Sequence, residues 1–128
     1  MTGRVLSIVE SAYRATLEEQ DDTVLWFSYT VASAGANVDV LLRGNAVNYA
    51  VAGQDASGLS FGDRRQTQPP RIDEDVLRLL QAGARVFAVA EDLATRGIES
   101  TDLVTGIETI KIAALAKLLE SYQHVWHW

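Results

Sequence analysis

Residues 79–89 of the chain read LLQAGARVFAV, a pattern that predicts a helix end followed at once by a buried strand. The helix covers residues 73–80, and its first turn is acidic, which complements the positive end of the helix dipole. Gly83 follows it, as glycine commonly does after a helix. Residues 86–90 are apolar throughout, as in strands buried on both faces of a parallel sheet. We expect four side chains of this helix to point inward: Val76, Leu77, Leu79 and Leu80.

Two further apolar runs of the same kind lie at residues 5–9 and 38–42. Between them runs a helical pattern that ends at Gly35, and Asp21, Asp22 or Thr23 is expected to cap its start. Strands that alternate with helices of this length imply right-handed crossovers and a mainly parallel sheet. The inward stripe of this first helix is Val24, Leu25, Phe27, Val31 and Ala32.

The last part of the chain continues the alternation. Residues 106–110 and 123–128 are expected to be short strands, with a helix near residues 112–120 between them. Its apolar stripe is Ile112, Leu115, Leu118 and Leu119. We therefore predict a single domain, residues 1–128, folded as an α/β three-layer sandwich with a mainly parallel sheet of about five strands.

Composition excludes several kinds of chemistry. The 128 residues include no cysteine, so disulfides, thiolate nucleophiles, persulfide carriers and iron–sulfur clusters are excluded. The net charge of -6, with the basic residues scattered, argues against nucleic-acid binding. No apolar run approaches the ~18 residues of a membrane span, and residues 1–9 lack the apolar core of a signal peptide. We expect a cytoplasmic protein that binds neither nucleic acid nor membrane.

One long stretch, residues 53–71, shows no regular pattern. It contains three glycines and two prolines among polar residues, and it exceeds the usual loop length of a compact domain. Two interpretations stay open: a lid over a pocket, or an excursion that packs on a partner.

Polar residues cluster where the predicted strands end. Ligands of open parallel sheets gather outside the carboxyl ends of the strands. Three segments fall there: residues 10–22, residues 43–45 and residues 91–97. Glu91 and Asp92 have two interpretations, as acceptors of backbone N–H groups at a helix start or as a general acid and base. The candidate site residues drawn from these segments are Glu10, Tyr13, Arg14, Asn45, Glu91, Asp92 and Arg96.

Each remaining candidate has a structural alternative. Asn45 follows Gly44 in an expected turn, Arg96 precedes Gly97 at an expected helix end, and Tyr13 and Arg14 suit a subunit contact as well as a ligand. His124 and His127 are three residues apart and so fall on opposite faces of a strand. We therefore expect no metal site and no cofactor.

The order of elements and several local strings resemble the DsrE/DsrF sulfur-relay family, which includes the TusBCD proteins. The resemblance rests on residues 38–47, on residues 79–98 with their Arg-Gly-hydrophobic ending, and on the closing His-Val-Trp. Active members of that family carry a persulfide on a Cys just after the third strand. Counted back from Gly97, that position is Val89 here, and a second family Cys falls at Asp92. Neither side chain can carry sulfur.

The resemblance implies an oligomer, a trimer or hexamer. The family also includes partner subunits that lack the active Cys and help to build hetero-oligomers. Three functions follow as hypotheses. The first is a non-catalytic oligomer that binds a small ligand or a protein partner at the strand ends, Val89 included. The second is a structural subunit of a sulfur-relay complex with a Cys-bearing DsrE-like partner. The third is an enzyme that uses Glu10, Glu91 or Asp92 as general base.

Overall fold

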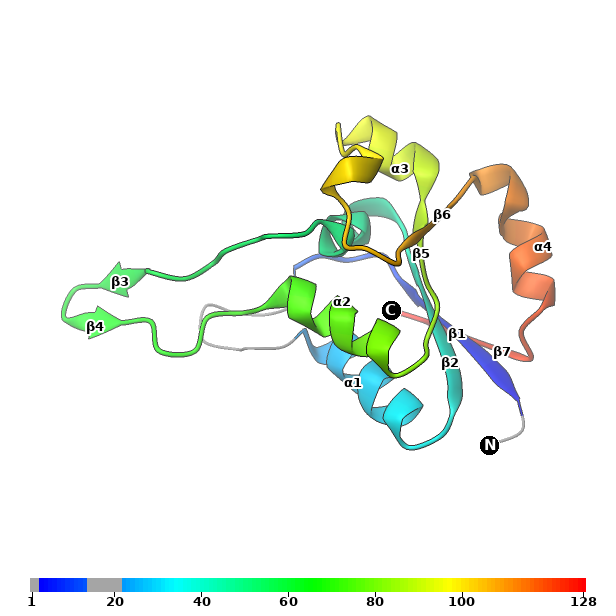
Figure 1. Ribbon diagram of the computed structural model, residues 1–128, viewed down its shortest axis with the longest axis horizontal. Helices are drawn as coiled ribbons and strands as arrows, with labels where there is room; N and C mark the ends of the chain where they lie inside the picture. Colours follow the sequence, from blue (N-terminus) through cyan, green and yellow to red (C-terminus); the bar gives the residue numbers. More distant parts are fainter. Residues whose placement is uncertain (1–2, 14–21) are drawn as a thin grey trace.

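The computed structural model describes residues 3–13 and 22–128, and its centre is a sheet of five parallel strands in the order β6-β5-β2-β1-β7 (Figure 1). The predicted mixed α/β fold with its parallel sheet is therefore confirmed. The strands are β1 (Arg4–Val9), β2 (Asn37–Leu42), β5 (Val86–Val89), β6 (Glu108–Ile110) and β7 (His124–His127).

Helices cover both faces of the sheet, which gives the expected three layers (Figure 1). On one face, α1 (Thr23–Ser33) and α2 (Ile72–Gln81) pack on the larger apolar core. On the other, α4 (Leu115–Glu120) packs on a smaller core that contains Leu6 and Phe87. The remaining helical elements are α3 (Ala90–Thr95) and the 3-10 turns η1 (Gly44–Ala50), η2 (Ser100–Asp102) and η3 (Ile112–Ala114).

Asp22 starts α1 and anchors it to its neighbours. Its buried carboxylate accepts the N–H groups of Val24 and Leu25, both at 3.0 Å. The hydroxyl of Tyr49, also fully buried, donates to the same carboxylate at 2.6 Å. The N–H of Asp22 donates to the buried Asp75 of α2 at 2.9 Å. Of the three cap candidates, Asp22 is thus the one that caps, and it also ties α1 to η1 and α2.

Three side chains expected to point inward are exposed instead. Phe27, Leu77 and Ile112 are 38%, 39% and 51% exposed. Fewer side chains of each helix are buried than predicted, because a helix on the face of a sheet contacts it only along a narrow strip of the helix surface. In α1 the inward place belongs to Ser28, whose hydroxyl donates to the hydroxyl of Ser7 in β1 at 3.3 Å.

Strand and helix ends also shift slightly. Ala90 begins α3 instead of ending β5, β6 begins at Glu108, and the last α-helix begins at Leu115 after a 3-10 turn. Such differences of a few residues are expected where backbone preferences change gradually along the chain.

Residues 53–71 form an arm that projects from the body (Figure 1). Its far end is a hairpin of β3 (Ser60–Phe61) and β4 (Arg64–Arg65), and Gly62, at a φ of +61°, makes the reversal. Phe61 is 59% exposed there. Among the described residues no helix is long and apolar enough to cross a membrane.

Candidate functional site

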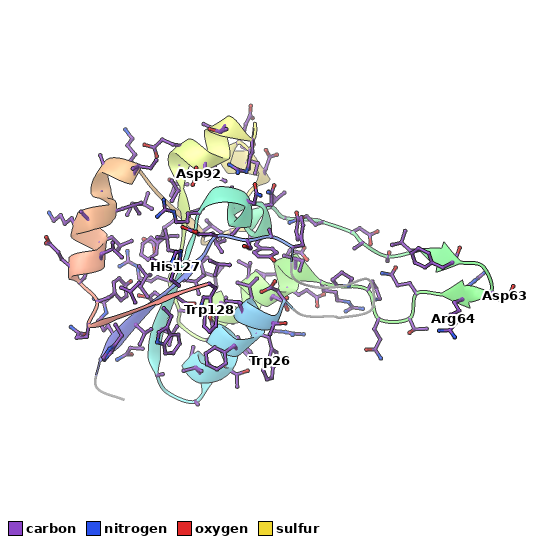
Figure 2. All side chains as sticks on the ribbon, turned by 180° about the vertical axis from the view of Figure 1, so that it is seen from behind. Trp26, Asp63, Arg64, Asp92, His127 and Trp128 are labelled. Carbon is purple, nitrogen blue, oxygen red and sulfur yellow. The ribbon has the colours of Figure 1, made fainter. Side chains whose placement is uncertain are left out.

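The carboxyl ends of the five strands meet at one edge of the sheet because all five run in the same direction. Glu10 follows β1, Arg43 follows β2, and Glu91 follows β5 by one residue. His127 ends β7. Figure 2 labels Asp92 and His127 in this region, with Asp63 and Arg64 far away on the arm. We call this row of polar groups the carboxyl edge.

Glu10 forms the centre of the first cluster at the carboxyl edge. Its Oε1 lies 3.3 Å from Nε of Arg43 and 3.1 Å from Nε2 of His127. The three side chains are each about 40–60% exposed, so they face solvent rather than the core. Strand pairing creates the cluster, because β1 lies between β2 and β7. The sequence placed Glu10 here but left Arg43 and His127 out of the site residues.

Asp92 and Arg96 hold the second cluster, which lies between α3 and η1. Oδ2 of Asp92 accepts the N–H of Gly44 at 2.8 Å. The guanidinium of Arg96 donates to the backbone oxygen of Asp92 at 3.1 Å and to Oδ1 of Asn45 at 2.7 Å. Gly44 adopts a φ of +57°, a backbone conformation that suits glycine. The structure therefore brings Asn45, Asp92 and Arg96 together, as the sequence placed them.

The carboxylates of Glu91 and Asp92 accept backbone N–H groups, but not those of the helix they begin. Neither caps α3, whose N-cap position is occupied by Val89, which makes no side-chain hydrogen bond to the helix. Glu91 accepts the N–H of Ile112 at 3.1 and 3.2 Å and so connects α3 to the segment after β6. Both carboxylates accept backbone N–H groups, as one interpretation predicted. The prediction that these N–H groups belong to the start of the helix is wrong. The cause is tertiary, since the donors come from neighbouring strand ends.

Tyr13 lies against the base of the arm. Its hydroxyl donates to the side chain of Gln54, and its ring meets Tyr49 edge-on with the ring centres 5.2 Å apart. Burial raises the pKa of Tyr13 above its usual value. Gln54 in turn donates to the backbone oxygens of Asn48 and Val51, at 2.7 and 3.0 Å. Arg14, its predicted companion, lies outside the described residues.

Val89 is 1% exposed and belongs to the smaller core, with Leu6, Ile8 and Leu41 among its members. This is the position at which the resemblance places the persulfide Cys. A packed apolar side chain occupies this position. Val89 therefore lies in the core beneath the carboxyl edge and has no exposed surface for a ligand.

The carboxyl edge can recognise polar groups. Arg43, Asn45, Arg96 and His127 offer N–H donors at the surface, while the carboxylates of Glu10, Glu91 and Asp92 are engaged in ion pairs or hydrogen bonds. Within residues 3–13 and 22–128, no group of three or more His, Asp or Glu side chains is placed to hold a metal ion.

Replacing Asp92 by Ala removes the acceptor of a half-buried N–H group. We expect the free energy of unfolding to fall by about 1–2 kcal/mol, because the Gly44 N–H loses its partner. Urea unfolding measures this. Asp92→Asn retains an oxygen acceptor and should recover part of the loss, and the exposed Glu120→Ala should change little. A D92A protein as stable as wild type would contradict the assigned role.

The amino-terminal edge of the sheet is polar too, but its groups satisfy one another. Asp39 accepts from the hydroxyl of Tyr122 at 2.6 Å and from the N–H of Arg85 at 2.8 Å. The guanidinium of Arg85 binds both carboxylate oxygens of Glu108, at 2.9 and 2.7 Å. Burial, followed by the hydrogen bond to Asp39, raises the pKa of Tyr122. We assign this edge a structural role.

Glu108 gives this structural role a pH dependence. The hydrogen bond from Arg85 lowers the pKa of Glu108, so the stabilisation is complete above the unfolded pKa of about 4.3 and is lost as the pH falls through the lower folded value. The pair is half exposed and screened, so Glu108→Gln should cost only about 0.5–1 kcal/mol at pH 7. Unfolding curves of both proteins from pH 7 to pH 3 should converge at the acid end. A difference that persists there would contradict the ion pair.

The sheet order and the flanking helices give the chain a DsrE-like α/β fold. Among solved structures, the ychN protein from E. coli has a TM-score of 0.77 at 17% identity, covering 99% of this chain and 100% of its own. Protein BT1422 from Bacteroides thetaiotaomicron, of unknown function, follows with a TM-score of 0.68 at 14% identity and coverages of 98% and 95%.

A third similar structure is protein MTH1491 from Methanobacterium thermoautotrophicum, also of unknown function. Its TM-score is 0.58 at 18% identity, covering 95% of this chain and 96% of its own. No protein-family model and no curated protein matches the sequence. Likeness at this level of identity establishes the fold alone.

Proposed function

We propose that this chain is a non-catalytic DsrE-like protein that forms an oligomer and binds a small ligand or a protein partner at the carboxyl edge. The observation that carries the proposal is the contrast at the end of β5. Val89 stands buried where the resemblance expects the sulfur-carrying Cys, while donor side chains gather at the surface of the same edge. Recognition groups are present there and a thiol is not.

The donors favour an oxygen-bearing ligand. Guanidinium groups bind carboxylates and carbonyl oxygens with good geometry. Arg43 and Arg96 are both exposed enough to exchange their present partners, Glu10 and Asn45, for such a ligand. We expect the occupant to be a carboxylate-bearing small molecule or a peptide segment, recognised in the cytoplasm.

The arm supports the partner interpretation of residues 53–71 over the lid interpretation. Isolated two-stranded hairpins are marginal in water, and this hairpin presents Phe61 and two arginines at its exposed end. The two arginines outnumber the single carboxylate of the tip, Asp63, so on a chain of net charge -6 the tip suits an acidic surface of another subunit. The same feature favours a second candidate, a structural subunit of a sulfur-relay complex with a Cys-bearing DsrE-like partner.

Native mass spectrometry of protein purified from its own host, without added ligand, tests the proposal. We expect an oligomer, a trimer or hexamer, that retains a small molecule or a partner chain. The double variant R43A/R96A should lose the retained mass, and Lys117→Ala, an exposed cation on α4, should keep it. A monomer with nothing bound would overturn the proposal. Recovery of a Cys-bearing DsrE-like chain in the complex selects the second candidate.

A further inference from the structure

Strand β7 forms one edge of the sheet and, among the described residues, pairs with β1 only. The backbone of Trp128 faces β1, because its N–H donates to the Ile8 oxygen at 2.9 Å and its oxygen accepts from Glu10 at 3.3 Å. Backbone groups alternate in direction along a strand. Those of Val125 and His127 therefore point outward, away from β1, and form a free edge.

Natural edge strands are protected by short length, by Pro, by Lys or other charges, or by a bulge. Of these features, β7 has only its short length of four residues. The sequence of β7 is HVWH, without Pro, Lys, Arg, Asp or Glu, and its register with β1 is regular. An edge of this composition is able to pair with another strand.

Apolar side chains border the edge on the α1 face of the sheet. Phe27 of α1 lies against Trp126 and Trp128, with ring centres 5.7 and 6.0 Å apart. Phe27 and Trp128 remain 38% and 42% exposed. Figure 2 shows Trp128 on the body, away from the arm. Exposed apolar groups gathered beside a free edge are typical of an interaction surface.

We propose that two copies of this chain pair antiparallel through β7 and form one continuous sheet across a two-fold axis. Val125 lies opposite the second copy's His127, and each such pair exchanges both of its backbone hydrogen bonds. Trp126 then lies at the axis, facing its own equivalent in the second copy. The aromatic side chains of α1 and β7 from both copies close over this junction.

A second copy is the occupant that the charges favour. The chain carries a net charge of -6, so two copies repel one another over most of their surfaces. Strand β7 itself has no carboxylate and no amine, and the nearby Glu10 carboxylate is ion-paired with Arg43 and His127, so self-pairing brings no unpaired like charges together. A two-fold contact also needs only one self-complementary patch, and the register about Trp126 provides it. The inference rests on the oligomer in the proposed function and names one of its contacts.

Val125→Lys tests the pairing, because it places a charge on the free edge at a side chain already 47% exposed. The matched control is Ile112→Lys, the same kind of change at a side chain 51% exposed on η3. In native mass spectrometry and sedimentation at micromolar concentration, wild type should contain an even number of subunits. V125K should halve that number, and I112K should leave it unchanged. Val125→Pro removes the outward N–H and should also halve it, with circular dichroism reporting the fold.

The outcomes separate this inference from the proposed function. A wild-type trimer that retains a ligand overturns the two-fold pairing and leaves the proposed function standing. An unchanged subunit number in both V125K and V125P also overturns the pairing. A monomer with nothing retained overturns both proposals together.

Discussion

Asp22→Ala is expected to lower the free energy of unfolding by about 3 kcal/mol, a large part of the ~5–15 kcal/mol that stabilises a typical domain. The carboxylate accepts the first N–H groups of α1, and loss of such a cap typically costs ~1 kcal/mol. It also accepts the hydroxyl of Tyr49, which is fully buried and so shielded from bulk water. A hydrogen bond to a charged group of this kind contributes about 1.5–3 kcal/mol.

A double-mutant cycle separates the two contributions. Tyr49→Phe removes only the hydroxyl, so D22A/Y49F should be less destabilised than the sum of the single variants by about 1 kcal/mol or more. Urea unfolding followed by fluorescence gives all four values. The exposed Asp63→Ala, at the tip of the arm, should stay within about 0.5 kcal/mol of wild type. Additive single variants would show that Asp22 and Tyr49 do not act as a pair.

Val89→Cys is expected to yield a thiol that reacts with a disulfide reagent at least about 100-fold more slowly than an exposed thiol. Position 89 is 1% exposed and packs in the smaller core, so the reagent reaches it only when that core opens. Apolar burial also disfavours the thiolate, which is the reacting species. Restoring the missing sulfur atom would therefore not restore a sulfur carrier.

Since the chain contains no cysteine, each introduced thiol is the only one present. Ala113→Cys is the matched control, because Ala113 is exposed on η3 near the same edge of the sheet. The time course of colour release with Ellman's reagent compares the two variants directly. Equal rates would show that the end of β5 opens readily, and the description of Val89 as closed core would be wrong.

Much of the fold was predictable because its signals are local. The apolar runs at residues 5–9 and 38–42 lie within β1 and β2, and the run at residues 86–90 forms β5 apart from its last residue. Every position in these runs is buried or partly buried, as in strands that are covered on both faces. The cap at Asp22 was among the candidates because a short polar side chain before a helix binds its first N–H groups. These features depend on a few neighbouring residues and on no distant contact.

The candidate site was predictable only in part. Asn45, Asp92 and Arg96 meet as expected, because two adjacent strands end beside one another. Arg43 and His127 were missed as partners of Glu10, because their meeting requires the order β2-β1-β7, which no local pattern states. Phe27 was placed inward, yet it lies beside Trp126 of β7 and beside Trp128, which follows that strand.

The amino-acid sequence by itself determined that no persulfide can form on a cysteine of this chain, because its 128 residues include no Cys. It also determined the alternation of strands and helices, through side-chain periodicity. Only the tertiary structure decided that Val89 is buried in the core, that Glu10 meets Arg43 and His127, and that β7 pairs on one side only within the described part of the chain. The physical reason is strand register, which brings residues distant in sequence within hydrogen-bonding reach.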